Sequence, residues 1–233
     1  TPDHMRFWFE MYMAQLAGGV VDENGKVMFT EAQAVQAFEY FQKWIDNNVI
    51  APFAQTSLFY QKFGENPEWV NGNMCIAWTW TSSMYKDFGG RTGFSTTTLP
   101  VMEGAKNTGV LLRPSQIYVV PSSSKNAAEA VKLLAFMTYD KDAAAILGTA
   151  RGVPSSKTSL AVAAETGAIS ELTETATPEG IAQAGDAQSA YQMNNQIVQA
   201  MQDVIDEFGF GKINAKQAGA KMVAHLNETL KSL

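Results

Sequence analysis

The stretch Gly109-Val-Leu-Leu-Arg-Pro-Ser-Gln-Ile-Tyr-Val-Val-Pro-Ser-Ser-Ser-Lys-Asn126 shows how this chain is organised. Its apolar run at 117–120 is short and rich in β-branched and aromatic residues, which predicts a buried strand. Polar residues follow, and Asn126-Ala-Ala-Glu129 then offers a capping residue before good helix formers. Val131, Leu134 and Thr138 lie along one face of the expected helix. The stretch therefore predicts a strand, a turn and a helix, in that order.

Helical patterns precede this stretch. Residues 5–17 are expected to form a helix that ends at Gly18-Gly19, because glycine easily adopts the left-handed conformation of a C-cap. Thr30-Glu-Ala-Gln33 fits a capping box, and apolar residues follow it at helical spacing. These residues are expected in the core: Val35, Phe38, Phe41, Trp44 and Ile45. Asn66-Pro67 is expected to begin a short helix.

Further strands are expected at 73–78 and 94–99, and further helices follow the central stretch. Thr177-Pro-Glu179 predicts the start of a short helix, Tyr191 lies at the expected start of a long one, and the last helix begins at Asn214. The two last helices carry apolar residues at helical spacing: Val198, Met201, Ile205, Phe208, Ala218, Met222, Leu226 and Leu230. Because helices outnumber strands and alternate with them, the sequence predicts an α/β fold with a small sheet.

The composition of the 233 residues is that of a folded protein, with 46% apolar and 17% charged residues. The net charge of −6 argues against nucleic acid or an anionic membrane surface as the main partner. No apolar run reaches the roughly 18 residues that a membrane span needs. The single cysteine, Cys75, is expected to be buried in the strand at 73–78. The chain opens on Thr1-Pro-Asp3 directly before a helix, so we interpret it as an internal portion of a longer protein.

Several catalytic signatures are absent from the sequence. It has no phosphate-binding Gly-x-x-x-x-Gly-Lys loop, no Gly-x-Gly-x-x-Gly fingerprint and no Gly-x-Ser-x-Gly elbow. The two histidines, His4 and His225, stand near opposite ends of the chain without metal-ligand spacing. Asp203 and Glu207 are one helical turn apart, but they lie off the apolar stripe and are expected on a solvated face. We therefore expect no enzyme, no metal site and no cofactor.

Two tryptophans offer a different chemistry. A carbohydrate site needs flat aromatic faces for the apolar face of the sugar and planar polar groups for its hydroxyls. Trp78 and Trp80 follow a predicted strand and precede a helix start at Ser82-Ser83, and they share a face if the strand continues that far. They are candidate ligand contacts, and burial in the core is the alternative.

The return strand and the run Arg151-Gly-Val-Pro-Ser-Ser-Lys157 resemble the extracellular solute-binding proteins of carbohydrate ABC importers, the maltose-binding-protein-like family 1. The resemblance covers nearly the whole chain but only the C-terminal portion of a family member. It implies an α/β, type II periplasmic-binding-protein-like fold with a helix-rich C-terminal lobe formed by residues 1–108 and 186–233. Residues 109–185 would return to the N-terminal lobe, whose first part is missing here.

The resemblance also implies ligand-binding residues. Trp80 lies where a tryptophan of the family stacks on sugar, although Trp78 and Thr79 stand where glycine and proline are common. The Arg113-Pro114-Ser115 triplet is similar to one in members that take acidic oligosaccharides. An aromatic residue of the maltose-binding branch matches Trp8, and Tyr191 is a third candidate for stacking. The expected ligand-binding residues are Trp8, Trp78, Trp80, Arg113, Ser115, Gln116 and Tyr191.

A protein of this kind would bind a sugar between its lobes, close by hinges near Gly109 and Gly185, and deliver the ligand to a membrane permease. The implied location is the bacterial periplasm or, for a lipoprotein, the cell surface. The partners implied are a sugar or oligosaccharide, the permease and the missing N-terminal part of the same protein, but no nucleic acid. Two other classes stay open: a carbohydrate-active enzyme, either a glycoside hydrolase or a lyase, and a protein-interaction module.

Overall fold

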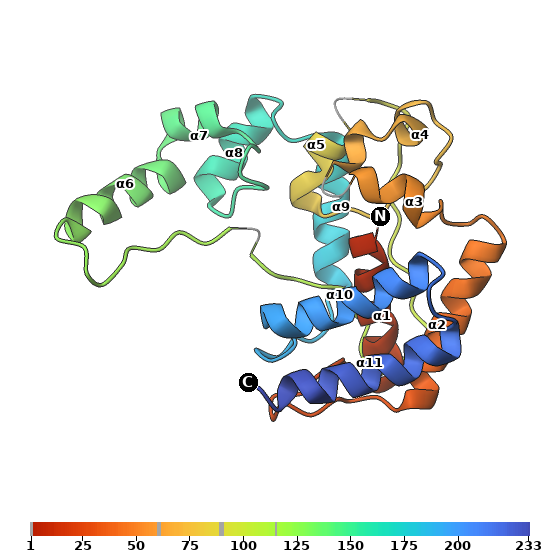
Figure 1. Cartoon of the computed structure of the whole chain (residues 1–233). Coiled ribbons are helices and arrows are strands. Elements are labelled where there is room, and N and C mark those ends of the chain that lie inside the picture. Colours follow the sequence, from red (N-terminus) through yellow and green to blue (C-terminus); the bar gives the residue numbers. More distant parts are fainter. Residues whose placement is uncertain (1, 60–61, 89–90, 115) are drawn as a thin grey trace. The chain divides into compact units, whose positions relative to one another are not determined.

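A computed structural model describes residues 2–59, 62–88, 91–114 and 116–233 of the chain (Figure 1). The chain divides into two compact units, which we describe separately. Unit 1 comprises Thr1–Cys75, Leu99–Leu112 and Gln183–Leu233, and unit 2 comprises Ile76–Thr98 and Arg113–Ala182. Within the described residues, no helix has both the length and the apolar character that a membrane span requires.

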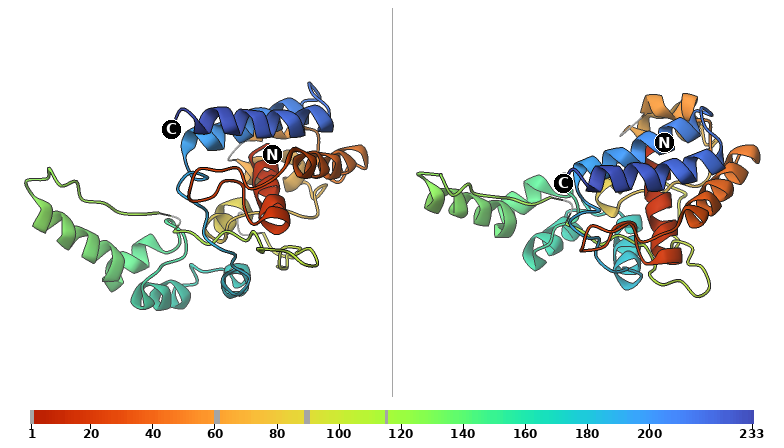
Figure 2. Two further views of the ribbon diagram at one scale, coloured as in Figure 1. Left: turned by 90° about the horizontal axis from the view of Figure 1, so that it is seen from below. Right: turned by 60° about the horizontal axis from the view of Figure 1, so that its bottom comes forward.

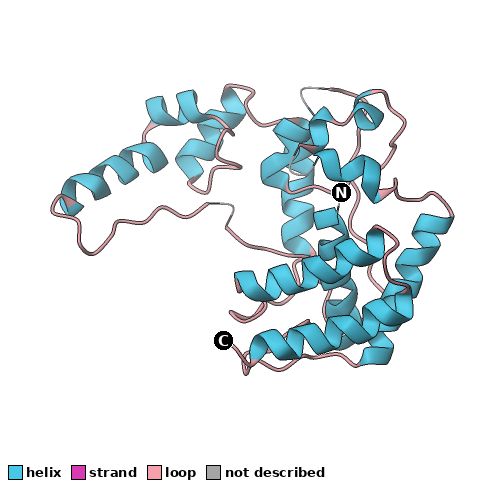
Figure 3. Ribbon diagram, in the orientation of Figure 1, coloured by secondary structure: helices cyan, strands magenta, loops and turns pink. Residues whose placement is uncertain are grey.

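Helices are the only regular secondary structure in the described ranges, as Figure 3 shows. Two isolated bridges, Val21 with Val27 and Ala150 with Gly152, are the sole β-type pairings there. The segments predicted as strands, 73–78, 94–99 and 117–120, are irregular. A strand needs a neighbouring backbone to complete its hydrogen bonds, and the described part of the chain gives these segments none. The helix-rich part of the fold prediction is thus confirmed, whereas the α/β class is not confirmed within this chain.

Four long helices form the core of unit 1: α1 (Pro2–Ala17), α2 (Glu31–Asp46), α10 (Asn195–Gly209) and α11 (Ala215–Leu230). Helix α11 packs along both α2 and α10, and the two blue helices lie side by side in every view (Figure 1 and Figure 2). At Gly219 the backbones of α11 and α2 approach so closely that a Cβ atom would lie 2.6 Å from the Val35 nitrogen. The smaller helices of the unit are α3 (Phe53–Thr56), η1 (Ser57–Phe59), η2 (Phe63–Glu65) and α4 (Pro67–Val70).

The helix starts of unit 1 follow the capping signals of the sequence. Thr30 and Gln33 form the predicted capping box, and Asn214 forms a second one with Gln217. The Asn66 side chain accepts from the Glu68 backbone N–H, with Pro67 in the first turn. Phe38 and Phe41 are buried as expected, and Trp44 packs partly buried against them. Local signals therefore suffice to place these helices.

Unit 2 holds η3 (Thr81–Ser83), α5 (Met84–Phe88), α6 (Ala127–Tyr139), α7 (Lys141–Leu147), α8 (Lys157–Glu165) and α9 (Glu171–Ala182). The helix expected after Asn126 is confirmed, although the Asn126 side chain makes no capping hydrogen bond. No residue of α6 is buried. The helix start predicted at Thr177 is wrong, because α9 begins at Glu171 and contains Pro178 in its interior.

Cys75 is exposed, so the prediction that it is buried is wrong. The expectation depended on a strand at 73–78, and without a neighbouring strand to cover it the side chain stays in solvent.

Candidate ligand-binding site

Three of the predicted site residues come together in unit 2. The ring centroids of Trp78 and Trp80 are 5.2 Å apart, and the two indoles meet nearly edge to face at 72°. The guanidinium carbon of Arg113 lies 4.6 Å from the centre of the Trp80 ring. Both tryptophans are half-buried and Arg113 is exposed. Residues far apart in the sequence thus form one aromatic and cationic cluster, which we call the Trp80–Arg113 cluster (Trp78, Trp80 and Arg113).

The local backbone holds the tryptophans in place. Trp80 is the N-cap residue of η3 with extended dihedral angles (φ −80°, ψ 142°), and its carbonyl accepts a hydrogen bond of 2.9 Å from the Ser83 N–H. The Thr79 hydroxyl donates to the Asp87 carboxylate on α5. The Trp-Thr-Trp segment is therefore tied to the helices that follow it.

The cluster offers two kinds of contact to a ligand. Indole rings bind the apolar C–H groups of a sugar ring, and an edge-to-face pair supplies two differently oriented surfaces. A guanidinium group stacked over an indole is held by the cation–π attraction, and its N–H groups form a planar fork suited to a carboxylate or to hydroxyl groups. The arrangement suits a ligand that has both an apolar face and a negative charge.

The formal charges are distributed unequally between the two units. Unit 1 contains nine Lys and Arg residues against fifteen Asp and Glu, whereas unit 2 contains eight of each. The whole net charge of −6 therefore belongs to unit 1. Unit 2 therefore carries no net charge of its own.

The other predicted site residues are placed differently. Trp8 belongs to unit 1, where its ring packs on Trp44 at 5.4 Å and 87° and joins the edge of the core. Tyr191 lies in a turn before α10 rather than in the helix, and its ring packs over the turn at Gly25. Gln116 is exposed in unit 2, and Ser115 lies outside the described residues. Their roles as ligand contacts stay predictions.

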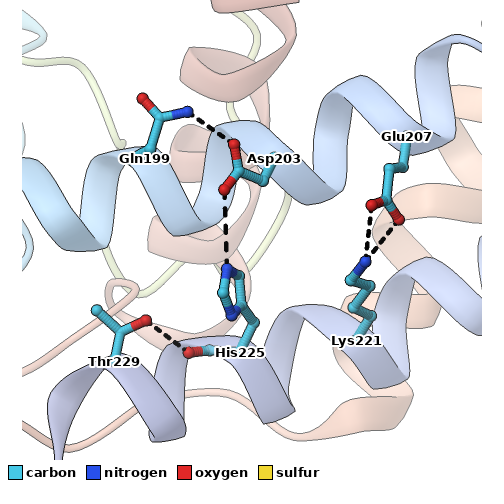
Figure 4. A network of polar contacts seen from close by, with 6 residues as sticks. All are labelled: Gln199, Asp203, Glu207, Lys221, His225 and Thr229. Atoms are coloured by element: carbon cyan, nitrogen blue, oxygen red, sulfur yellow. Dashed lines mark hydrogen bonds and ion pairs between the residues drawn. The ribbon is translucent and has the colours of Figure 1, made fainter. Parts of the chain in front are cut away.

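The carboxylates of α10 have partners on α11, as Figure 4 shows. Lys221 Nζ lies 2.6 Å from Glu207 Oε2, and His225 Nε2 lies 3.8 Å from Asp203 Oδ2. The Gln199 amide donates to Asp203 at 2.7 Å. The Lys221–Glu207 contact is a partly exposed ion pair between neighbouring helices, whereas Gln199 bonds to Asp203 within α10. Within the described part of the chain, no group of acidic, histidine or cysteine side chains could hold a metal ion.

A buried carboxylate in α1 escaped the sequence reasoning. Glu10 is 4% exposed, forms an ion pair with Arg6 and accepts a hydrogen bond of 2.6 Å from Gln188. Burial raises the pKa of Glu10, although Arg6 and Gln188 favour the charged form. Arg6 stands one helical turn before Glu10 in this helix, and the spacing is the signal that could have revealed the pair.

A family model matches most of the chain, and solved structures share its fold. Residues 1–172 match the family model described as bacterial extracellular solute-binding protein. The fold is similar to a periplasmic oligogalacturonide binding protein from Yersinia enterocolitica in complex with saturated digalacturonic acid. The TM-score is 0.84 at 23% identity, over 100% of this chain and 60% of that chain. None of the curated proteins matches the chain at a significant level.

Two further solved structures are similar in the same way. A periplasmic solute binding protein from Pectobacterium atrosepticum gives a TM-score of 0.83 at 22% identity, over 98% of this chain and 58% of that chain. A de novo designed cysteine esterase gives 0.78 at 22% identity, over 100% and 59%. The chain thus spans about three fifths of the length of the structures it matches, and its fold is that of a portion of a periplasmic binding protein.

Proposed function

Because this chain belongs to the bacterial extracellular solute-binding proteins, we propose that it is part of the substrate-binding component of an ABC importer. It binds a sugar or oligosaccharide between two lobes and delivers it to a membrane permease. The protein works in the periplasm or, as a lipoprotein, at the cell surface. The observation that carries the proposal is the Trp80–Arg113 cluster, because it combines stacking surfaces with a planar donor group.

The proposed ligand is an acidic oligosaccharide, made of uronic sugars. Arg113 supplies the positive charge for a carboxylate, and Trp80 and Trp78 supply faces for the sugar rings. The oligogalacturonide binding protein from Yersinia, with its bound digalacturonic acid, gives a precedent for such a ligand on this fold. Trp8, Ser115, Gln116 and Tyr191 are the further contacts that we propose.

We propose that residues 1–108 and 186–233 belong to the C-terminal lobe and residues 109–185 to the N-terminal lobe. The exposed apolar residues of 109–185 support the view that this segment packs against a further part of the protein. Several are more than half exposed: Leu112, Ile117, Val119, Val131, Leu133, Tyr139 and Ile146. Surfaces of this kind mark contact sites when they are contiguous.

A thermal-shift series tests the function. The chain is heated with digalacturonate, with trigalacturonate and with neutral disaccharides such as maltose. A ligand that binds the native state alone raises the midpoint as its concentration passes the dissociation constant. We expect a rise with the acidic sugars and a smaller rise or none with the neutral ones. The same series is repeated on a chain extended at its N-terminus. A rise in the midpoint of the extended chain alone means that binding needs the missing lobe, whereas the absence of a rise in both proteins contradicts the proposal.

Two variants test whether the Trp80–Arg113 cluster causes the rise in the thermal midpoint. Trp80→Ala is expected to weaken binding by about tenfold or more, because stacking surface is lost without any loss of core packing. Tyr139→Ala is the matched control, since Tyr139 is an exposed aromatic residue of the same unit. Equal affinity of a folded Trp80→Ala protein removes this residue from the site. Hydrolysis of the sugars during the assay would favour an enzyme, and binding to none of them would favour a protein-interaction module.

A further inference from the structure

Thr79 stands between the two tryptophans of the Trp80–Arg113 cluster, and its side chain has a different neighbour. In an extended backbone, successive side chains point to opposite sides, and Trp80 has extended dihedral angles (φ −80°, ψ 142°). The ring centres of Trp78 and Trp80 lie 5.2 Å apart, so the two rings share one side of the segment. The Thr79 side chain therefore points to the other side.

The neighbour of Thr79 is a carboxylate of a helix that follows. The Thr79 hydroxyl donates a hydrogen bond to the carboxylate of Asp87, which stands eight residues further along the chain in α5. A hydrogen bond to a charged acceptor is stronger than one between neutral groups. Both side chains are half-buried, so water competes less for this bond than it would on an exposed surface. The contact can therefore fix the backbone between the two tryptophans.

Asp87 is itself held by the helix on which it stands. Helix α5 begins at Met84, which is 7% exposed, so its burial anchors the first turn. The short helix η3 joins Trp80 to α5, and the Trp80 carbonyl accepts from the Ser83 N–H at 2.9 Å. The Thr79–Asp87 bond adds a side-chain connection to this backbone connection. A segment that is tied twice has fewer arrangements than a segment that is tied once.

We propose that Thr79 and Asp87 are positioning residues for the tryptophan pair. Their hydrogen bond fixes the backbone at residue 79, so that Trp78 and Trp80 present their rings together on the opposite side. A ligand then meets stacking surfaces that are already arranged, and binding costs less conformational entropy. All four residues lie in unit 2 and in the proposed lobe 1–108, so the bond acts within one unit and one lobe. The consequence for sugar binding rests on the proposed function, whereas the arrangement of the rings does not.

Circular dichroism of the free chain tests the arrangement without a ligand. Two indoles in contact couple optically and give paired bands of opposite sign, whose size depends on the distance and the angle between the rings. Trp8 and Trp44 form a second pair in unit 1, with ring centres 5.4 Å apart. Each protein is therefore compared with the same protein carrying Trp80→Phe, because the difference between the two spectra isolates the signal of the Trp78–Trp80 pair.

Two substitutions of Thr79 separate the effect of its hydroxyl from that of its shape. Thr79→Val keeps the shape but replaces the hydroxyl with a methyl group, whereas Thr79→Ser keeps the hydroxyl. We expect Thr79→Val to lose most of the pair signal and Thr79→Ser to retain it. Calorimetric titration is expected to show digalacturonate binding weakened by about fivefold in Thr79→Val and within about twofold of the wild type in Thr79→Ser.

Thr166→Val is the matched control, because it removes a hydroxyl of the same unit that bonds to the Val162 carbonyl at 2.9 Å. It is expected to change neither the pair signal nor the affinity. An unchanged pair signal in a folded Thr79→Val protein would overturn the proposal, and so would an equal loss of signal in Thr79→Ser. Unchanged affinity in a Thr79→Val protein that has lost the signal would overturn the role in binding.

Two further outcomes are separated by the design. If Thr79→Val does not fold, Asp87→Ala removes the same bond from the side of α5 and decides by the same signal and affinity. If neither the chain nor its N-terminally extended form binds an acidic sugar, the proposed function fails. The circular dichroism then still decides whether Thr79 and Asp87 position the rings.

Discussion

The two units differ in how completely they bury their apolar residues. Unit 1 encloses large side chains from α1, α2, α10 and α11, among them Phe9, Phe38, Met201 and Leu226, each with no measurable exposure. In unit 2 the buried apolar residues that the structure describes are Met84, Ala143, Ala144 and Ala163, while many large ones face solvent. Because apolar burial is the main source of folding free energy, unit 1 gains more stabilisation from its own core than unit 2 does.

Replacing one phenylalanine by alanine in each unit is expected to give the largest difference in stability between the two units. Phe38→Ala removes a ring that packs on Phe9, Phe41 and Phe208, with the Phe208 ring centre at 4.9 Å. We expect it to destabilise the chain by about 3–5 kcal/mol. Phe136→Ala in α6 removes a ring that is half exposed, and we expect less than about 1 kcal/mol. Urea unfolding followed by circular dichroism measures both.

Equal losses from the two phenylalanine variants would break the comparison. The N-terminally extended chain offers a further check. If a further part of the protein covers α6, the loss caused by Phe136→Ala grows towards that of a buried phenylalanine, whereas the loss caused by Phe38→Ala stays the same.

A second variant tests how tightly unit 1 is packed. Gly219→Ala introduces a Cβ atom 2.5 Å from the Val35 side chain and 2.6 Å from its backbone nitrogen, so α2 and α11 must move apart. We expect a loss of about 1–3 kcal/mol in the free energy of unfolding. Gly180→Ala in α9 is the matched control, because nothing lies within 4 Å of its added atom. A harmless Gly219→Ala would mean that the two helices are less closely packed than described.

The buried Glu10 makes the stability of unit 1 depend on pH. Its folded pKa is raised by burial, so its contribution is greatest below the pKa of the unfolded chain and is lost as pH rises through the raised folded pKa. We therefore expect the stability of the wild type relative to Glu10→Gln to fall as pH rises from about 4.5 through the raised pKa. Thermal midpoints of both proteins across this range provide the measurement. A difference that stays constant or grows with pH contradicts the burial effect.

The smallest effect is expected at the ion pair between α10 and α11. Lys221→Ala removes the contact with Glu207, whose side chain is 33% exposed. Partly exposed ion pairs contribute about 0–1 kcal/mol, so we expect a loss below about 1 kcal/mol that vanishes in high salt. Unfolding at low and high ionic strength measures it. A larger loss that salt does not change would place this pair in the core of unit 1 rather than on its surface.

The sequence predicts the helices of unit 1 well because their signals are local. Thr30 with Gln33, and the spacing of Phe38 and Phe41, each act within a few residues. The strand predictions for 73–78 and 117–120 are wrong, because a strand depends on a neighbouring backbone that the local sequence does not specify. The wrong prediction for Cys75 has the same origin. Local patterns thus describe the unit that completes its own core, and fail for segments that need distant partners.

The candidate site could be predicted only in part. The resemblance pointed to Trp78, Trp80 and Arg113 one by one, and the structure brings these three into contact. No periodicity or spacing joins residue 80 to residue 113, so their proximity required the fold. Glu10 was missed because a charged residue of a helix is usually solvated, and its partner Gln188 is distant in the sequence.

One titration tests the central claim, that the Trp80–Arg113 cluster recognises an acidic sugar. Digalacturonate and a neutral disaccharide are titrated by calorimetry into the wild type, Arg113→Ala and the control Lys125→Ala, which removes the same charge from an exposed residue of unit 2. We predict that Arg113→Ala weakens digalacturonate binding by about tenfold or more, while neutral sugars change by less than about threefold and Lys125→Ala changes neither. Equal losses for acidic and neutral sugars, or unchanged binding of digalacturonate, would contradict the account.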